Sequence, residues 1–188
     1  MSIEGKTWKL VCGLTLAGLL SALVSCVGMY KSAHHYAQGV SLSQKGQYTA
    51  AVSELTKAIQ ESPSSALAHY QRGFAYASLG SQALAIADFT TALALGKAFL
   101  KHYSLLHLCY YNRGVSYHAI GKKDEAIADY TSALAIKRDF AEAYANRGKA
   151  YADLGDRERA LADLRKAIET NPSYREMIGP MIEQLESK

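Results

Sequence analysis

Proline is scarce in this chain, at only 3 of its 188 residues. Hydrophobic residues make up 49% of the sequence, which is more than an intrinsically disordered protein contains. Few prolines and frequent alanines favour long helices over strands joined by turns. The sequence therefore predicts an all-α protein, and its length suits one domain with a sizeable core.

Cysteine and net charge are also low. The three cysteines, Cys12, Cys26 and Cys109, have no metal-ligand spacing, and no disulfide framework can be read from them. The net charge is only +4, and residues of both signs are interspersed along the chain, whereas nucleic-acid-binding proteins gather Lys and Arg on one face. We therefore expect no metal, no cofactor and no nucleic-acid partner.

The N-terminal segment has the pattern of an export signal. Two lysines precede a stretch from Leu10 to Val24 that carries no charge, which is a basic region followed by an apolar core of signal-peptide length. The core ends in the segment Leu23–Cys26, with the sequence LVSC, which resembles the lipobox of bacterial lipoproteins. The resemblance implies a signal peptide over residues 1–25, acylation of Cys26 and anchorage by the acyl chains.

The residue after the cysteine bears on where such a lipoprotein resides. In Gram-negative lipoproteins the usual inner-membrane retention signal is an aspartate there, so Val27 implies the outer membrane, facing the periplasm. The resemblance thus implies a lipid-anchored protein of the bacterial cell envelope. Two alternatives stay open. The 21 uncharged residues from Leu10 to Tyr30 are long enough for an uncleaved transmembrane anchor, and a plain secretory signal has the same pattern.

The rest of the chain repeats itself. The segments Tyr110–Gly114 and Tyr144–Gly148 read YYNRG and YANRG and lie 34 residues apart. Aligning the chain on their glycines recovers two earlier copies, as expected of a repeat protein. After a short linker at 26–31, the repeats are residues 32–65, 66–99, 107–140 and 141–174.

The repeated positions resemble those of the tetratricopeptide-repeat (TPR) family. That family has a small residue at position 8, a turn glycine near position 15, and alanines at positions 20 and 27. Here these positions are Gly39, Gly73, Gly114 and Gly148; Gly46, Gly80, Gly121 and Gly155; Ala51, Ala85, Ala126 and Ala160; and Ala58, Ala92, Ala133 and Ala167. The resemblance implies a right-handed α-solenoid of four helix-turn-helix repeats, with the first helix of each repeat (helix A) on the concave side.

Two segments depart from the repeat. Residues 100–106 are inserted between the second and third repeats, and seven residues make nearly two helical turns. We therefore expect the insertion to lengthen helix A of the third repeat at its start, with Gly96 capping the helix before it; an ordinary long loop is the alternative. Apolar residues at helical spacing in the tail predict a capping helix over 175–188, which Gly179 and Pro180 should kink or split.

Ligands of this family usually contact helix A, so the resemblance implies a peptide-binding groove on the concave side. The candidate binding residues are Tyr36, Val40, Tyr70, Gln71, Phe74, Tyr111, Asn112, Val115, His118, Asn146 and Lys149. The cations with which one TPR subset clamps a chaperone's C-terminal carboxylate are replaced here by aromatic and apolar residues. We therefore expect an apolar, aromatic-rich peptide or a partner helix as the ligand. The alternative is that these tyrosines pack between repeats.

Motifs for catalysis are missing from the chain. It has no glycine-rich phosphate loop, nucleophile elbow or HExxH-type motif. Its six histidines include no pair at the spacing that puts two metal ligands on one helix face. The aspartates Asp88, Asp129 and Asp163 recur with the repeat, which predicts outward-facing polar residues and no acid/base pair. We expect neither enzymatic activity nor a small-molecule substrate.

Together these features predict an adaptor or scaffold, tethered to the envelope membrane, that binds partner proteins or peptides in its groove. The alternative is a structural subunit, or a pilotin-like assembly factor, of a larger envelope complex. Such a protein would bind through its convex face or through residues 100–106.

Overall fold

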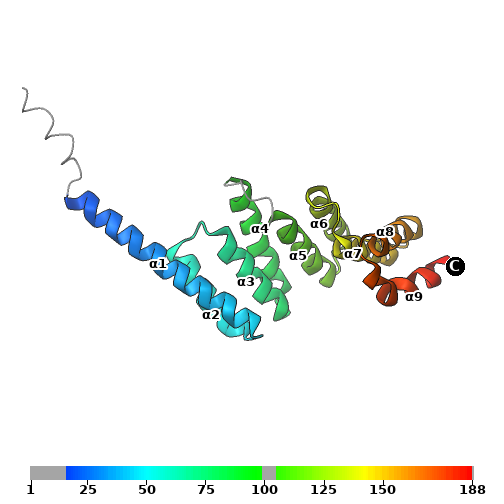
Figure 1. Ribbon diagram of the computed structural model, residues 1–188, viewed down its shortest axis with the longest axis horizontal. Helices are drawn as coiled ribbons and strands as arrows, with labels where there is room; N and C mark the ends of the chain where they lie inside the picture. Colours follow the sequence, from blue (N-terminus) through cyan, green and yellow to red (C-terminus); the bar gives the residue numbers. More distant parts are fainter. Residues whose placement is uncertain (1–15, 99–104, 188) are drawn as a thin grey trace, which may run out of the picture.

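The computed structural model describes residues 16–98 and 105–187 (Figure 1). Within them the chain forms α-helices joined by short turns and has no β-strand. The predicted all-α fold is confirmed. The first 15 residues of the predicted signal peptide and residues 100–104 of the predicted insertion lie outside the described residues.

Eight of the helices form four hairpins, one for each repeat. They are α1 (Leu16–Gln44) with α2 (Tyr48–Glu61), α3 (Ala66–Ser78) with α4 (Gln82–Ala98), α5 (Leu106–Ala119) with α6 (Lys123–Ile136), and α7 (Ala141–Asp153) with α8 (Arg157–Thr170). A 3₁₀ turn, η1 (Pro172–Tyr174), then leads into α9 (Arg175–Glu186). The odd-numbered helices α1 to α7 are the A helices, and their even-numbered partners are the B helices.

A glycine in the turn reverses the chain within each hairpin. Gly46, Gly80, Gly121 and Gly155 have φ angles of 73°, 77°, 79° and 80°. This is the left-handed region, which residues with a Cβ atom rarely adopt. The turns are closed by backbone hydrogen bonds, such as the one that Gly80 N–H donates to the Ala77 carbonyl at 3.0 Å.

A second glycine lets the two helices of each hairpin cross closely. A Cβ atom on Gly148 would lie 2.9 Å from Leu164 Cγ and 3.2 Å from the Ala160 carbonyl oxygen, and both of these residues are fully buried. A larger residue at this crossing would overpack the core. The same contact recurs between Gly39 and Leu55, Gly73 and Phe89, and Gly114 and Tyr130.

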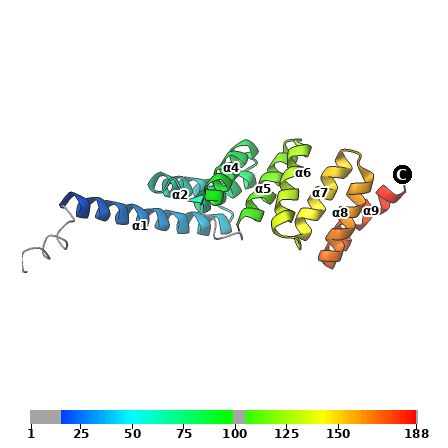
Figure 2. The ribbon, with the colours of Figure 1, turned by 90° about the horizontal axis from the view of Figure 1, so that it is seen from above.

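The hairpins stack in chain order into an elongated solenoid (Figures 1 and 2). The first three B helices each pack on the A helix of the following repeat, as α4 does on α5. The A helices also contact one another, α1 with α3, α3 with α5 and α5 with α7. This places the A helices together on one side of the stack.

Helix α1 extends well beyond its partner, with 29 residues against the 14 of α2, and it projects from one end of the molecule (Figure 1). Residues 26–31, predicted to be a linker, are part of this helix. Val27, Met29 and Tyr30 are exposed on it. Among the described residues, no helix is both long and apolar enough to span a membrane; residues 10–15 of the possible uncleaved anchor lie outside them.

The helix before the insertion is longer than its equivalents. Helix α4 has 17 residues, whereas α2, α6 and α8 have 14 each. Gly96 lies inside α4 and is not among the glycines with positive φ, so the prediction that it caps this helix is wrong. A Cβ atom there would lie 3.1 Å from Leu106 Cδ2, so the glycine makes room for the start of α5. Of the residues expected to lengthen α5, residues 100–104 lie outside the described ones, whereas Leu105 is the N-cap and Leu106 the first residue of the helix.

Helix α9 covers the last repeat, so the predicted capping helix is confirmed. Ile178 is fully buried and packs with Leu164 and Ala167 of α8. The helix runs without interruption through Pro180, so the predicted split does not occur. Pro180 cannot donate a hydrogen bond to the Glu176 carbonyl, but both residues are exposed, and water can satisfy that carbonyl.

Candidate binding surface

The recurring aspartates are buried, and the prediction that they face outward is wrong. Asp88, Asp129 and Asp163 are only 5%, 5% and 7% exposed. Each accepts two hydrogen bonds from an arginine on helix A of its own repeat. Arg113 donates from Nε and Nη2 to the two Asp129 carboxylate oxygens, both at 2.8 Å. The equivalent pairs are Arg72 with Asp88 and Arg147 with Asp163.

Each of these arginines also reaches back to the preceding repeat. Arg113 Nη1 donates to Thr90 Oγ1 at 3.0 Å, and Arg147 Nη1 donates to Thr131 Oγ1 at 2.9 Å. Arg72 contacts Thr56 in the same way. We call these groups the Arg–Asp–Thr links, and they join each repeat to the one before it. The signal for them was present in the sequence, because the arginine lies 16 residues before every one of these aspartates.

The first repeat is built differently. It has Gln38 where the other repeats have the linking arginine, and Glu54 where they have aspartate. Glu54 instead accepts hydrogen bonds from His35 Nδ1 at 2.7 Å and from Lys57 Nζ at 2.6 Å. These bonds lower the pKa of Glu54, with the Lys57 bond contributing most.

The Arg72–Asp88 pair of the second repeat stays charged in the folded protein. Burial by itself raises the pKa of Asp88, but hydrogen bonds from Arg72 and His69 outweigh burial and hold that pKa below its ordinary value. The same pairing raises the pKa of Arg72 above its ordinary value. A carboxylate that is ionised and saturated with donors is a structural ion pair and a poor general acid.

Two of the predicted ligand-binding tyrosines lie between repeats. The Tyr111 ring centroid is 4.8 Å from that of Phe140, and the Tyr111 hydroxyl accepts a 3.0 Å hydrogen bond from Asn146 Nδ2. The Tyr70 hydroxyl likewise accepts one from Asn112 Nδ2 at 3.1 Å. Burial raises the pKa of each tyrosine to about 12. These four candidates therefore hold one another and form a polar seam between adjacent A helices.

The remaining candidates differ in how far they are engaged within the protein. His118 Nε2 lies 2.9 Å from Asp153 Oδ2, which connects the ends of α5 and α7. Tyr36 is half-buried against the cluster around Leu55, and Gln71 is half-buried on α3.

The ninth position of each repeat stays accessible. Phe74 and Val115 are 38% and 36% exposed, and Val40 and Lys149 are half-buried. The four residues occupy equivalent places on α1, α3, α5 and α7, and each of these helices contacts the next one in the series. We call them the ninth-position row. It is apolar over three repeats and ends in a cation.

The described residues hold no metal-ligand cluster, and the thiol of Cys109 is unreactive. No group of three or more His, Cys, Asp or Glu side chains there could hold a metal ion. Cys109 is only 1% exposed, and burial raises the pKa of its thiol to about 12. The thiol is therefore protonated near neutral pH and is a weak nucleophile.

Sequence comparison finds the same repeats. A family model described as TPR repeat matches residues 39–80 and 114–155. Two models described as Tetratricopeptide repeat match residues 66–95 and 141–174. No curated protein matches the chain.

Several solved structures are similar. MamA is 27% identical, with 77% of this chain and 81% of MamA covered at a TM-score of 0.68. The first TPR of Spaghetti (RPAP3), bound to the HSP90 peptide SRMEEVD, is 25% identical, with 68% and 95% covered and a TM-score of 0.62. The APC/C heterotetramer Cut9–Hcn1 shares the fold, at 18% identity, 80% and 29% coverage and a TM-score of 0.74. The repeats, their packing and these matches agree that the chain belongs to the tetratricopeptide-repeat family.

Proposed function

We propose that this protein is a scaffold without catalytic activity that binds a partner peptide or helix on its A helices while an acylated Cys26 holds it at the envelope membrane. One observation carries the binding surface. Phe74 and Val115 stay exposed at equivalent places on two adjacent helices, whereas the polar candidates beside them are engaged with one another. The inner face of a solenoid is its usual binding surface.

The ninth-position row favours an apolar ligand. Its members in the first three repeats, Val40, Phe74 and Val115, carry no charge, and Lys149 in the fourth repeat is its single cation. The peptide bound by Spaghetti contains the acidic sequence EEVD, which calls for more than one cation on the binding surface. We therefore infer an apolar peptide or helix face as the ligand of this chain, with any acidic group at the Lys149 end.

Paired charge variants test this surface. Phe74→Glu combined with Val115→Glu places two carboxylates in the row and should abolish capture of the partner in a cross-linking pull-down from native membranes. Leu84→Glu is the matched control, because Leu84 lies on the B helix α4 and is 52% exposed. Capture that survives the double variant, or that is lost only with Leu84→Glu, would overturn the proposed surface.

The anchor is proposed from the sequence of the segment Leu23–Cys26. With acyl chains on Cys26, each buried methylene adds about 0.8 kcal/mol to membrane binding, so several chains hold the domain firmly. The outer membrane is the proposed location because Val27 follows the cysteine. Mass spectrometry should find a mature chain that begins at Cys26 and carries acyl mass, which Cys26→Ser removes. An intact chain with an unmodified Met1 would contradict the lipid anchor.

A further inference from the structure

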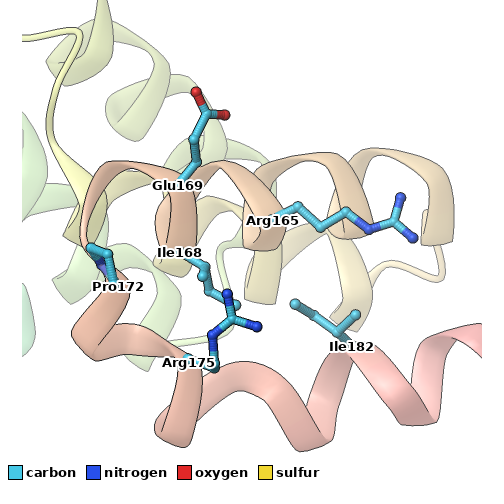
Figure 3. Close-up of a pocket in the computed structure, with 6 residues that line it drawn as sticks. All are labelled: Arg165, Ile168, Glu169, Pro172, Arg175 and Ile182. Atoms are coloured by element: carbon cyan, nitrogen blue, oxygen red, sulfur yellow. The ribbon is translucent and has the colours of Figure 1, made fainter.

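The C-terminal end of the solenoid has an open cleft of about 510 Å³ between α8 and α9 (Figure 3). Its apolar surface comes from Ile168 of α8, Pro172 of η1 and Ile182 of α9. Three charged residues complete the lining: Arg165, Glu169 and Arg175. This cleft is formed by α8, η1 and α9 and contains none of the ninth-position row.

Comparison with the second and third repeats explains the exposed apolar surface at Ile168. Ile168 occupies the repeat position of Leu93 and Leu134, which are only 4% and 6% exposed. The next A helix covers both: Leu93 packs with Leu106 and Cys109 of α5, and Leu134 packs with Ala143 of α7. After α8 the chain continues into η1 and α9 instead, and Ile168 remains only partly buried. Its side chain is therefore available to a ligand.

The last repeat carries a cation at a position where the other repeats have a neutral threonine. Thr56, Thr90 and Thr131 share one repeat position, and each accepts a hydrogen bond from the arginine of the next repeat. At the same position the fourth repeat has Arg165. In the other repeats the threonine thus contacts an arginine of the next repeat, whereas in the last repeat the residue itself is an arginine. A segment that approaches this end is complementary if it carries carboxylates.

Arg165 and Arg175 are both available to pair with a carboxylate of a ligand. Arg165 Nη2 lies 2.6 Å from Glu186 Oε1, but these side chains are 62% and 45% exposed, and such surface pairs contribute little. No carboxylate of residues 16–98 or 105–187 pairs with Arg175. Figure 3 shows the Arg175 side chain pointing from the start of α9 toward Ile168. The Glu169 carboxylate points away from the cleft in that view and pairs with Lys166 at 2.8 Å.

We propose that this cleft binds an acidic segment of a partner protein. One apolar side chain of that segment lies against Ile168, Pro172 and Ile182. A neighbouring carboxylate accepts hydrogen bonds from the Arg175 guanidinium, whose planar donors suit a bidentate contact. This site is independent of the ninth-position row, so the scaffold has two separate contact surfaces.

A peptide titration followed by ¹⁵N NMR tests the cleft. The probe is the peptide Gly-Glu-Leu-Glu-Gly, acetylated and amidated so that it has no terminal charges. Its addition should shift amide signals of residues 165–182. Replacing both glutamates by glutamine, or the leucine by serine, should each weaken binding about tenfold, the change that one lost charge-assisted or apolar contact produces.

Protein variants separate the cleft from other sites. Arg175→Gln should weaken the acidic peptide about tenfold, because one charge-assisted contact is lost. Arg138→Gln, at an exposed arginine between α6 and α7, and Phe74→Glu in the ninth-position row should leave its binding unchanged. Thermal unfolding checks that every variant is folded. The proposal is overturned by the absence of shifts at millimolar peptide, by equal binding of the glutamine peptide, by unchanged binding to Arg175→Gln, or by shifts confined to α3 and α5.

Discussion

Two periodic sets of side chains lie on different sides of the same A helices. Arg113 and Val115 lie two residues apart, which is roughly 200° around a helix. The arginine therefore faces Asp129 and Thr90 and joins the repeats, while the valine remains exposed. Both sets recur with the repeat, so periodicity alone does not distinguish a paired residue from an exposed one. The difference is that the hydrogen-bond partners of the arginine, an aspartate and a threonine, also recur with the repeat. Val115 has no recurring partners of this kind.

The largest effect should come from breaking an Arg–Asp–Thr link. Asp129→Ala leaves the Arg113 guanidinium, only 17% exposed, without its carboxylate, and removing one partner of a buried ion pair costs about 3–5 kcal/mol. Urea unfolding measures this loss. Glu54→Ala in the first repeat should cost clearly less, because its partners His35 and Lys57 are more exposed. Equal losses in the two variants would contradict the special role of the links.

Acid should weaken the link at Asp88. The folded-state pKa of Asp88 lies below the ordinary pKa of an aspartate, which is about 3.9. Its contribution to stability is therefore complete above the unfolded-state pKa and is lost as the pH falls through the folded-state pKa. The free energy of unfolding, measured from pH 6 to pH 2, should fall below about pH 4. Asp88→Asn should flatten this acid limb, and a limb of unchanged steepness would show that other carboxylates cause it.

The seam between A helices should matter less. Asn146→Ala removes the hydrogen bond to the Tyr111 hydroxyl, and a typical buried hydrogen bond contributes about 1 kcal/mol. The thermal unfolding midpoint should fall modestly, and a second variant, Tyr111→Phe, should lower it by a similar amount. A much larger drop for Tyr111→Phe would mean that the hydroxyl has a further partner.

The smallest effect on stability should come from the ninth-position row. Phe74 is 38% exposed and its ring meets Tyr48 at a centroid distance of 6.5 Å, so Phe74→Glu should cost less than about 1 kcal/mol. Chemical denaturation measures this change beside that of Asp129→Ala. A loss as large as that of Asp129→Ala would place Phe74 in the core and remove it from the binding surface.

The fold could be predicted because its pattern rests on small residues. Gly148 and Ala160 must be small for the helices to cross, and Gly155 must adopt positive φ. Residues with such strict requirements are visible in the sequence alone. The site was harder to predict, because Asp129 and Tyr111 accept hydrogen bonds from side chains on other helices. A polar residue with a repeat period fits an exposed surface or a buried pair equally well until its partner is found.

Gly96 shows a second limit of the sequence pattern. A glycine near a helix end predicts a cap. Gly96 instead lies inside α4, where its missing side chain makes room for Leu106 of α5. Close approach and positive φ both require glycine, and the sequence does not distinguish them. Pro180 is a similar case: a proline in the sequence predicts a break in the helix, but α9 runs through it without interruption.

Site-specific photo-cross-linking tests the scaffold function most directly. A benzoylphenylalanine replaces Val115 on α5 in one variant and Ala128, an exposed residue of the B helix α6, in the other. Both are expressed in the native cell and irradiated. We expect a covalent partner adduct from position 115 and none from position 128. An adduct from position 128 without one from position 115 would contradict binding on the A helices.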